Sequence, residues 1–205
     1  KKISGSNSPC CYYGDSTGFM RAIASDLNSA KNMIMSGASF ATALTDSEQY
    51  PFQFIPGPNY TQMFSIILEY IASEAKGGKK PTVAFVYSDT EFGRDPIVPS
   101  RDYAKKVGVE VVEEIMTKPG SVDVSAEVIK LRRKRPDYVI FHGYILSPIN
   151  EFMVQMRQMG LDTKFMGTFW SMDRLIIEKM GKDADGFMGV MPYNYFGADE
   201  DGPML

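Results

Sequence analysis

The chain has 205 residues, 44% of them hydrophobic, and a net charge of −3 at neutral pH. This composition is that of a globular protein and excludes a disordered or fibrous one, while the length permits one large or two small domains. The mildly acidic balance disfavours nucleic-acid binding, which needs clustered Lys and Arg. The one basic run, residues 130–135, is interpreted as a solvated last helical turn. No segment approaches the roughly 18 apolar residues that span a bilayer.

The chain opens without a signal peptide, because Lys1 and Lys2 lead directly into a polar stretch. We therefore expect the natural N-terminus to lie upstream. Cys10 and Cys11 are adjacent, and a disulfide between neighbouring strand residues would be strained. The simplest interpretation is two small buried hydrophobic side chains, which leaves their disulfide status and the compartment open.

The first part of the chain predicts a strand, a helix and a second strand. Residues 10–13 form the first strand, Gly14 turns the chain, residues 18–29 are helical, and residues 33–35 form the second strand. Residues 50–59 contain three prolines and a glycine, which oppose a continuous helix. We expect this stretch to cross between two lobes.

Beyond the crossing, strands and helices alternate, which is typical of βαβ units that build a parallel sheet. Asn59 is a good N-cap for a helix with an apolar face. That face comprises Met63, Phe64, Ile66, Ile67, Tyr70 and Ile71. The predicted strands are residues 82–87, 109–115, 137–141, 164–166 and 186–190. The predicted helices between them are residues 101–106, 124–135 and 148–159.

These elements predict an α/β protein with two Rossmann-like lobes, each built on a parallel sheet. Residues 1–56 would form part of lobe 1, residues 57–191 lobe 2, and residues 192–205 the return toward lobe 1. The non-helical stretch 191–196 would begin this return.

The stretch Gly14-Asp15-Ser16-Thr17-Gly18 lies between a predicted strand and a predicted helix. Hydroxyl groups and the first free amides of the helix converge there, which favours an anion. A carboxylate bound by Ser16 and Thr17 is one interpretation, and a simple N-cap is the other.

The same five residues match the G-x-S-x-G pattern of serine hydrolases, with His142 as the base that such a mechanism would need. A serine hydrolase built on Ser16 and His142 is therefore an alternative function. One histidine and two adjacent cysteines offer no ligand spacing for zinc, and the acidic residues form no calcium loop. The sequence indicates no metal and no cofactor.

Aromatic and small polar residues follow several predicted strands, where open parallel sheets bind ligands. These residues are Ser39, Phe40, Phe92, Tyr144, Phe169 and Trp170. Any one of them could belong to the core, but their shared position indicates a binding cleft.

Five motifs in fixed order resemble the type I periplasmic binding proteins of ABC transporters, above all those of the branched-chain amino acid type. They are SGASFATALT (36–45), VAFVYSDTEFGRD (83–95), PDYVIFHGY (136–144), GLDTKFMGTFW (160–170) and DGFMGVMPY (185–193). The resemblance implies two lobes that close over a small ligand without catalysis, and a membrane permease as partner. It implies a periplasmic or extracytoplasmic, membrane-anchored location. It also implies that this chain holds part of lobe 1 and most of lobe 2.

The resemblance also assigns binding residues. It places carboxylate binding on Ser16 and Thr17 and on the loop Ala38, Ser39 and Phe40, and it places pocket aromatics at Phe92 and Tyr144. Amino-acid binders of the family hold the ligand's ammonium group with an acidic residue, where this chain has Phe169 and Trp170. A buried ammonium would lack a counter-ion, so an aromatic or otherwise apolar carboxylate is the expected ligand. A receptor or regulator domain with the same fold is a further alternative.

Overall fold

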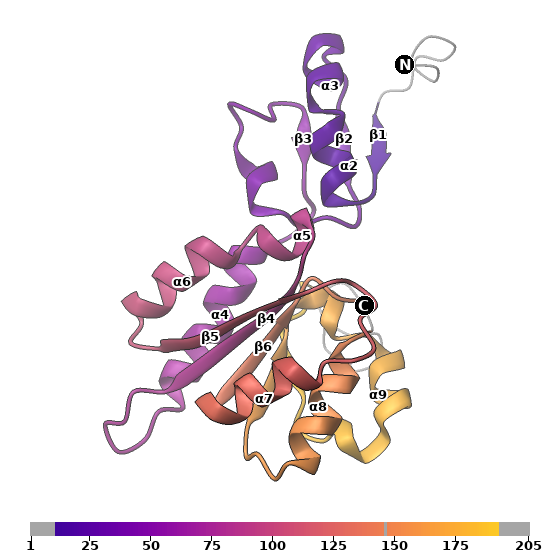
Figure 1. The fold of residues 1–205 in the computed structure, drawn as a ribbon. Coiled ribbons are helices and arrows are strands. Elements are labelled where there is room, and N and C mark those ends of the chain that lie inside the picture. Colours follow the sequence, from indigo (N-terminus) through magenta and orange to yellow (C-terminus); the bar gives the residue numbers. More distant parts are fainter. Residues whose placement is uncertain (1–10, 146, 193–205) are drawn as a thin grey trace, which may run out of the picture.

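The computed structural model describes residues 11–145 and 147–192. It contains a three-stranded sheet of order β1-β2-β3 and a five-stranded sheet of order β5-β4-β6-β7-β8, which lie at opposite ends of the molecule (Figure 1). All strand pairs are parallel, which confirms the predicted α/β class. The part built on the smaller sheet is called lobe 1 and the part built on the larger sheet lobe 2.

Lobe 1 contains six short elements. They are β1 (Tyr12–Gly14), α2 (Thr17–Ala22), α3 (Ala24–Ala30), β2 (Ile34–Ser36), the 3-10 helix η1 (Thr42–Thr45) and β3 (Gln53–Phe54). The single helix predicted for residues 18–29 is divided at Ile23, whose φ of −92° and ψ of −1° interrupt the α-helical geometry. The third strand occupies part of the predicted crossing, so the connection between the sheets shortens to residues 55–59.

The cysteine prediction is wrong where it can be tested. Cys11 is an exposed free thiol rather than a buried hydrophobic residue. Cys10 lies outside the described residues.

The two faces of the lobe 1 sheet differ. Ile34 points into the lobe 1 core, which also contains Met20, Leu27, Leu44 and Tyr50. On the opposite face, Tyr13, Met35 and Phe54 are register neighbours across the three strands and are 75%, 47% and 49% exposed. Parallel sheets are usually covered on both faces, and the described part of the chain covers only one face here.

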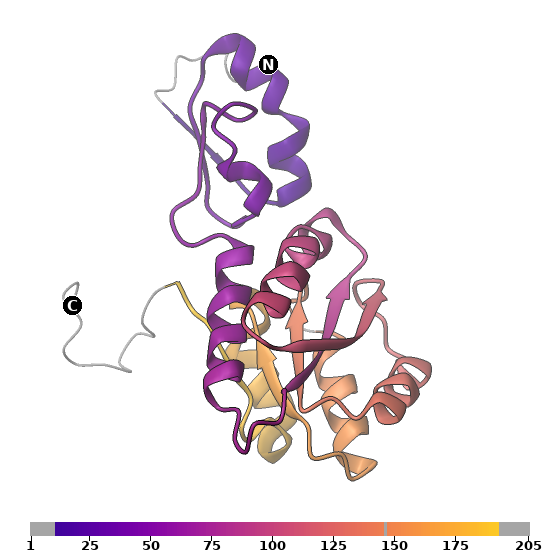
Figure 2. The same cartoon turned by 90° about the vertical axis from the view of Figure 1, so that its left-hand side faces the viewer.

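Lobe 2 is a sheet between two layers of helices. Its elements are α4 (Tyr60–Ser73), β4 (Thr82–Ser88), α5 (Glu91–Arg94), α6 (Ile97–Lys106), β5 (Glu110–Thr117), α7 (Ser125–Lys134), β6 (Tyr138–His142), α8 (Ile149–Gln158), β7 (Lys164–Gly167), the 3-10 helix η2 (Phe169–Ser171), α9 (Arg174–Met180), the 3-10 helix η3 (Gly181–Ala184) and β8 (Met188–Gly189). Helices α4 and α6 cover one face, and α7, α8 and α9 cover the other (Figures 1 and 2).

The five strands predicted for lobe 2 are all present, with ends that differ by at most two residues. The helix predicted from residue 101 begins earlier, at Ile97. Helices α5 and α9 were not predicted, because four and seven residues are too few for an apolar period to stand out. The return predicted for residues 191–196 lies mostly outside the described residues.

Helix α4 begins with a capping box, as expected for Asn59. The Asn59 side chain accepts from the backbone N–H of Gln62 at 2.9 Å, and the Gln62 side chain accepts from the backbone N–H of Asn59 at 2.8 Å. Two amides at the helix start are satisfied in this way, so the helix starts sharply at the end of the crossing.

Helix α4 contributes to both hydrophobic cores. Tyr60 and Met63, in its first turn, pack into the core of lobe 1, whereas Phe64 packs into lobe 2 together with Ile67, Leu68 and Ile71 further along the helix. Ile66 and Tyr70, which were predicted on the apolar face, are 51% and 38% exposed.

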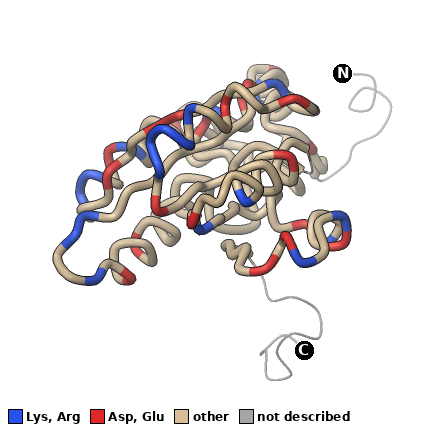
Figure 3. Tube along the Cα trace, turned by 60° about the horizontal axis from the view of Figure 1, so that its bottom comes forward, with Lys and Arg blue, Asp and Glu red and all other residues tan. Residues whose placement is uncertain are grey.

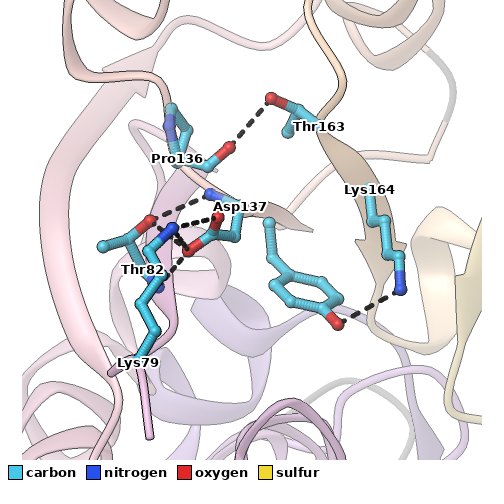
Figure 4. Close-up of polar contacts among 7 residues, drawn as sticks. Lys79, Thr82, Pro136, Asp137, Thr163 and Lys164 are labelled. Carbon is cyan, nitrogen blue, oxygen red and sulfur yellow. Dashed lines mark hydrogen bonds and ion pairs between the residues drawn. The ribbon is translucent and has the colours of Figure 1, made fainter. Parts of the chain in front are cut away.

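Hydrogen bonds align the amino ends of the strands in lobe 2 (Figure 4). The Asp137 carboxylate accepts from the backbone N–H and the hydroxyl of Thr82 at 2.9 and 2.8 Å, and it pairs with Lys79 at 3.0 Å. The Thr163 hydroxyl donates to the carbonyl of Pro136 at 2.9 Å. Strands β4, β6 and β7 are therefore fixed in register before they run toward lobe 1.

Lys and Arg are interspersed with Asp and Glu along the chain trace (Figure 3). The basic run 130–135 ends α7 with exposed side chains, as predicted for a solvated last turn. Within the described ranges, none of the helices has the length and apolarity required to span a membrane.

The core of lobe 2 makes a direct stability test possible. Ile140 is fully buried at the centre of β6, while Ile129 on α7 is 43% exposed. We expect Ile140→Ala to lower the free energy of unfolding by about 2–5 kcal/mol, because it removes buried methyl groups and leaves a cavity. Ile129→Ala, the matched control, should change it by less than about 1 kcal/mol. Urea denaturation measures both, and equal effects would contradict the assigned burial.

Candidate binding cleft between the lobes

A cavity at the lobe junction has a volume of about 590 Å³ and is lined by both lobes. Lobe 1 contributes Ser16, Thr17 and Gly18. Lobe 2 contributes Thr90, Glu91, Phe92, Pro119, Gly120, Gly143, Tyr144, Ile145 and Ser147. The lobe 2 residues follow β4, β5 and β6, so the cavity lies outside the carboxyl ends of the strands, where open parallel sheets bind ligands.

A second cavity of about 230 Å³ adjoins the first. It is lined by Asp15, Ser16, Thr17, Ala38, Tyr60, Phe92, Ile145 and Trp170. Four residues, Ser16, Thr17, Phe92 and Ile145, line both cavities. The two cavities therefore form one cleft between the lobes.

Most of the predicted binding residues meet in this cleft. Six of them line one or both cavities: Ser16, Thr17, Ala38, Phe92, Tyr144 and Trp170. Ser39, Phe40 and Phe169 are not among the lining residues. Ser39 is buried and shares a 2.6 Å hydrogen bond with Thr17, and Phe40 packs edge-on against Phe169 with ring centroids 5.4 Å apart. These three residues form a layer behind the cleft.

The lobe 1 wall of the cleft is hydroxylated. Ser16 is exposed and caps α2 by accepting from the backbone N–H of Phe19 at 3.4 Å, which leaves its hydroxyl hydrogen free for a ligand. Thr17 is held in place by Ser39, whose hydroxyl also accepts from the backbone N–H of Ala41 at 3.3 Å. Because α2 has only six residues, an anion here would be bound mainly by hydroxyl groups rather than by a helix dipole.

Aromatic rings form the opposite wall. The indole N–H of Trp170 donates to the Tyr60 hydroxyl at 3.2 Å, and the rings of Tyr60 and Phe92 lie 5.0 Å apart. Burial raises the pKa of Tyr60 to about 12, so its hydroxyl stays protonated. Tyr60 was missed because it was not recognised on the apolar face of its helix; its place at the lobe crossing was the available signal.

Tyr144 shares a 2.7 Å hydrogen bond with Thr117, and burial raises the pKa of Tyr144 above its ordinary value. Only part of this side chain therefore faces the cleft. The loop residue Ile145, which was not predicted, is 56% exposed and lines both cavities. Isolated loop residues of this kind carry no periodic signal in the sequence.

His142 does not form a nucleophile–base pair with Ser16. Its Nδ1 lies 2.7 Å from the Thr168 hydroxyl, and its Nε2 lies 3.0 Å from the carbonyl oxygen of Phe92. Burial lowers the pKa of His142 to about 3, so it is a poor proton acceptor at neutral pH. This arrangement argues against the hydrolase hypothesis. Within the described residues, no three His, Cys, Asp or Glu side chains are grouped to hold a metal ion.

Helix α5 and the residue after it connect lobe 2 to lobe 1 beside the cleft. Asp95 accepts from the backbone N–H groups of Thr42 and Ala43 at 2.6 and 3.1 Å, and Glu91 pairs with Arg21 at 3.4 Å. Burial raises the pKa of Asp95, although both amide hydrogen bonds oppose this rise. Phe92 lies between these two contacts, so the interlobe contacts and the cleft share one short segment.

Residues 13–203 match the family described as periplasmic binding protein. The chain belongs to this family. The fold, the two lobes and the cleft between them agree with that assignment, and the family consists of binding proteins rather than enzymes.

Several proteins similar to this chain are named as binding proteins. The Leu/Ile/Val/Thr-binding protein of Salmonella typhimurium is 28% identical over 57% of this chain and 32% of its own length. A branched-chain amino acid ABC transporter structure from Thermus thermophilus with bound valine has a TM-score of 0.83 and 22% identity, covering 91% of this chain and 47% of that one. A solute-binding protein from Rhodopseudomonas palustris with 3,4-dihydroxybenzoic acid has a TM-score of 0.72 and 21% identity, covering 89% of this chain and 50% of that one. The matched stretch thus covers about a third of the Leu/Ile/Val/Thr-binding protein and about half of each of the two solved structures.

Substitution of Asp95 should loosen the lobe 1 backbone at Thr42 and Ala43. We expect Asp95→Ala to leave the amides of Thr42 and Ala43 without their partner and to speed their hydrogen exchange about tenfold or more. Asp89→Ala, which removes only a surface pairing with Arg94, is the matched control and should leave both amides unchanged. Unaltered exchange in Asp95→Ala would show that the contact does not hold the lobes.

Proposed function

We propose that the chain forms part of an extracytoplasmic solute-binding protein that captures a small aromatic or apolar carboxylate between its lobes for an ABC-type permease. The observation that carries this proposal is the cleft itself, which has hydroxyl groups on the lobe 1 side and rings on the lobe 2 side. Such a division suits a ligand with one charged end and one flat or apolar end.

The acid group would lie against lobe 1. Ser16 offers a hydroxyl donor, and Thr17 offers a second in the arrangement in which the Ser39 hydroxyl donates to Thr17. Hydrogen bonds to a carboxylate are stronger than those to a neutral acceptor, so two hydroxyls contribute substantially.

The apolar body of the ligand would lie between Phe92, Tyr144 and Trp170. Aromatic rings favour offset or edge-on contact with another ring, and the three side chains come from separate segments of lobe 2. The two cavities, of about 590 and 230 Å³, leave space for a benzoate-sized molecule. The relative with bound 3,4-dihydroxybenzoic acid supports this class of ligand.

A free amino acid is the competing ligand, as the relatives with bound valine or with Leu/Ile/Val/Thr specificity suggest. Among the residues that the structure describes, two acidic ones line the cleft. Glu91 is paired with Arg21, and Asp15 is exposed, so neither forms a buried counter-ion for an ammonium group. A buried ammonium without such a partner costs several kcal/mol, which favours an acid without an amino group.

Capture would proceed by closure of the lobes. A ligand that contacts both walls stabilises the closed form and shifts the population toward it. The permease would then recognise the closed arrangement. A location outside the cytoplasm follows from this role.

Calorimetry tests the ligand class. We expect benzoate and hydroxybenzoates to bind with measurable heat, and leucine to bind more weakly. Quenching of Trp170, which is the sole tryptophan and lines the cleft, gives an independent titration. Tight leucine binding without any response to aromatic acids would reject the proposed ligand class.

A single hydroxyl tests the orientation of the ligand. Ser16→Ala should weaken binding of an aromatic acid about ten- to hundredfold, because it removes a donor to a charged group. Ser25→Ala, an exposed serine on α3, is the matched control and should bind like the unchanged protein. If both variants bind equally well, the acid group does not contact Ser16.

A further inference from the structure

His142 is a buried polar residue that the proposed function has not yet used. It is the only histidine in the chain, it ends β6, and it is fully buried. A buried imidazole loses its hydration, and such a residue is retained at low cost only where both ring nitrogens find partners. Both nitrogens of His142 do so, and each partner belongs to a different segment of the cleft wall.

The hydrogen bonds define one arrangement of the ring. The carbonyl oxygen of Phe92 can only accept, so Nε2 of His142 carries the hydrogen. Nδ1 of the neutral ring is then an acceptor, and the Thr168 hydroxyl donates to it. The imidazole thus links the segment after β4 to the segment after β7.

Ring contacts extend this link to the helix between the lobes. The centroid of His142 lies 4.8 Å from that of Tyr60, 5.0 Å from that of Phe92 and 5.4 Å from that of Phe64, all nearly edge-on. Two of these partners, Tyr60 and Phe92, line the cleft. One side chain therefore contacts α4, α5 and the turn at the end of β7.

Both hydrogen-bond partners lie next to aromatic residues of the site. Phe92 itself lines both cavities, and Thr168 precedes the short helix η2 that carries Trp170. Trp170 donates to Tyr60, which contacts His142 from the other side. Phe92 and Tyr60 thus pack against the imidazole, and Trp170 is connected to it through Tyr60.

We propose that His142 is a positioning residue that sets the spacing of Phe92 and Trp170 and thereby selects flat aromatic acids over aliphatic ones. This inference rests on the proposed function, because the selectivity belongs to the same cleft. His142 touches no ligand in this account, and it acts through the two ring-bearing segments that it joins.

Two substitutions separate its hydrogen bonds. An asparagine amide lies near the place of Nδ1, so His142→Asn keeps a partner for Thr168 and loses the bond to Phe92. A glutamine amide reaches toward the place of Nε2, so His142→Gln keeps the Phe92 bond and loses the Thr168 bond. Thr168→Val removes the same bond from the other side without altering the imidazole. Ile176→Ala, in the core of lobe 2 away from these rings, is a control for lost stability alone.

The readouts are the affinities for benzoate and leucine and the emission of Trp170 in the unliganded protein. We expect His142→Gln and Thr168→Val to shift the Trp170 emission, and His142→Asn to shift it less. Each of the three should lower the benzoate-to-leucine affinity ratio about two- to tenfold. Ile176→Ala should lower stability and leave emission and ratio unchanged.

The outcomes distinguish this inference from the proposed function. If the unchanged protein binds neither ligand, the proposed ligand class fails, and the emission of the unliganded variants still tests the positioning role. If the unchanged protein binds benzoate while His142 and Thr168 variants keep its selectivity and emission, the positioning role is overturned. If Ile176→Ala changes the Trp170 emission and the affinity ratio as much as the His142 variants do, His142 acts only as a core residue.

Discussion

Helix α4 belongs to two hydrophobic cores at once, and the orientation of the lobes depends on this sharing. Its first turn is buried among lobe 1 side chains and the rest among those of lobe 2, so neither lobe can turn freely without disturbing packing. The capping box at Asn59 starts the helix directly after the crossing, so the connection between the two sheets is short. The carboxyl ends of the lobe 2 strands are therefore held toward the hydroxylated loops of lobe 1.

The chemistry of the cleft follows from which lobe contributes which side chains. Lobe 1 presents short polar groups on tight loops, held by bonds such as that between Thr17 and Ser39. Lobe 2 presents large rings, held by packing and by His142. A ligand that satisfies both walls must itself be divided into a polar and an apolar part. The two adjoining cavities share lining residues from both lobes, so both walls belong to one cleft.

The lobe 2 sheet was predictable from sequence because its central strands contain buried apolar runs such as Val83–Val86. Residues at strand ends such as Phe92 and Tyr144 could be assigned to a cleft, since parallel strands bring their carboxyl ends to one edge. The sequence did not predict the short elements α5 and β3, because contacts with the other lobe or with a neighbouring strand determine their structure. The sequence also could not show that Trp170 lines the cleft whereas Phe40 lies behind the cleft wall. That difference depends on the direction of one turn rather than on composition.

The burial of the single histidine has a consequence for the hydrogen bonds that it makes. Imidazole is the side chain that ordinarily gains a proton between pH 5 and 8, and here burial holds its pKa at about 3. Mild acidification of the surroundings therefore adds no imidazolium to this chain. The hydrogen bonds that the imidazole makes to Phe92 and Thr168 therefore keep the same donor and acceptor pattern in neutral and in weakly acid media.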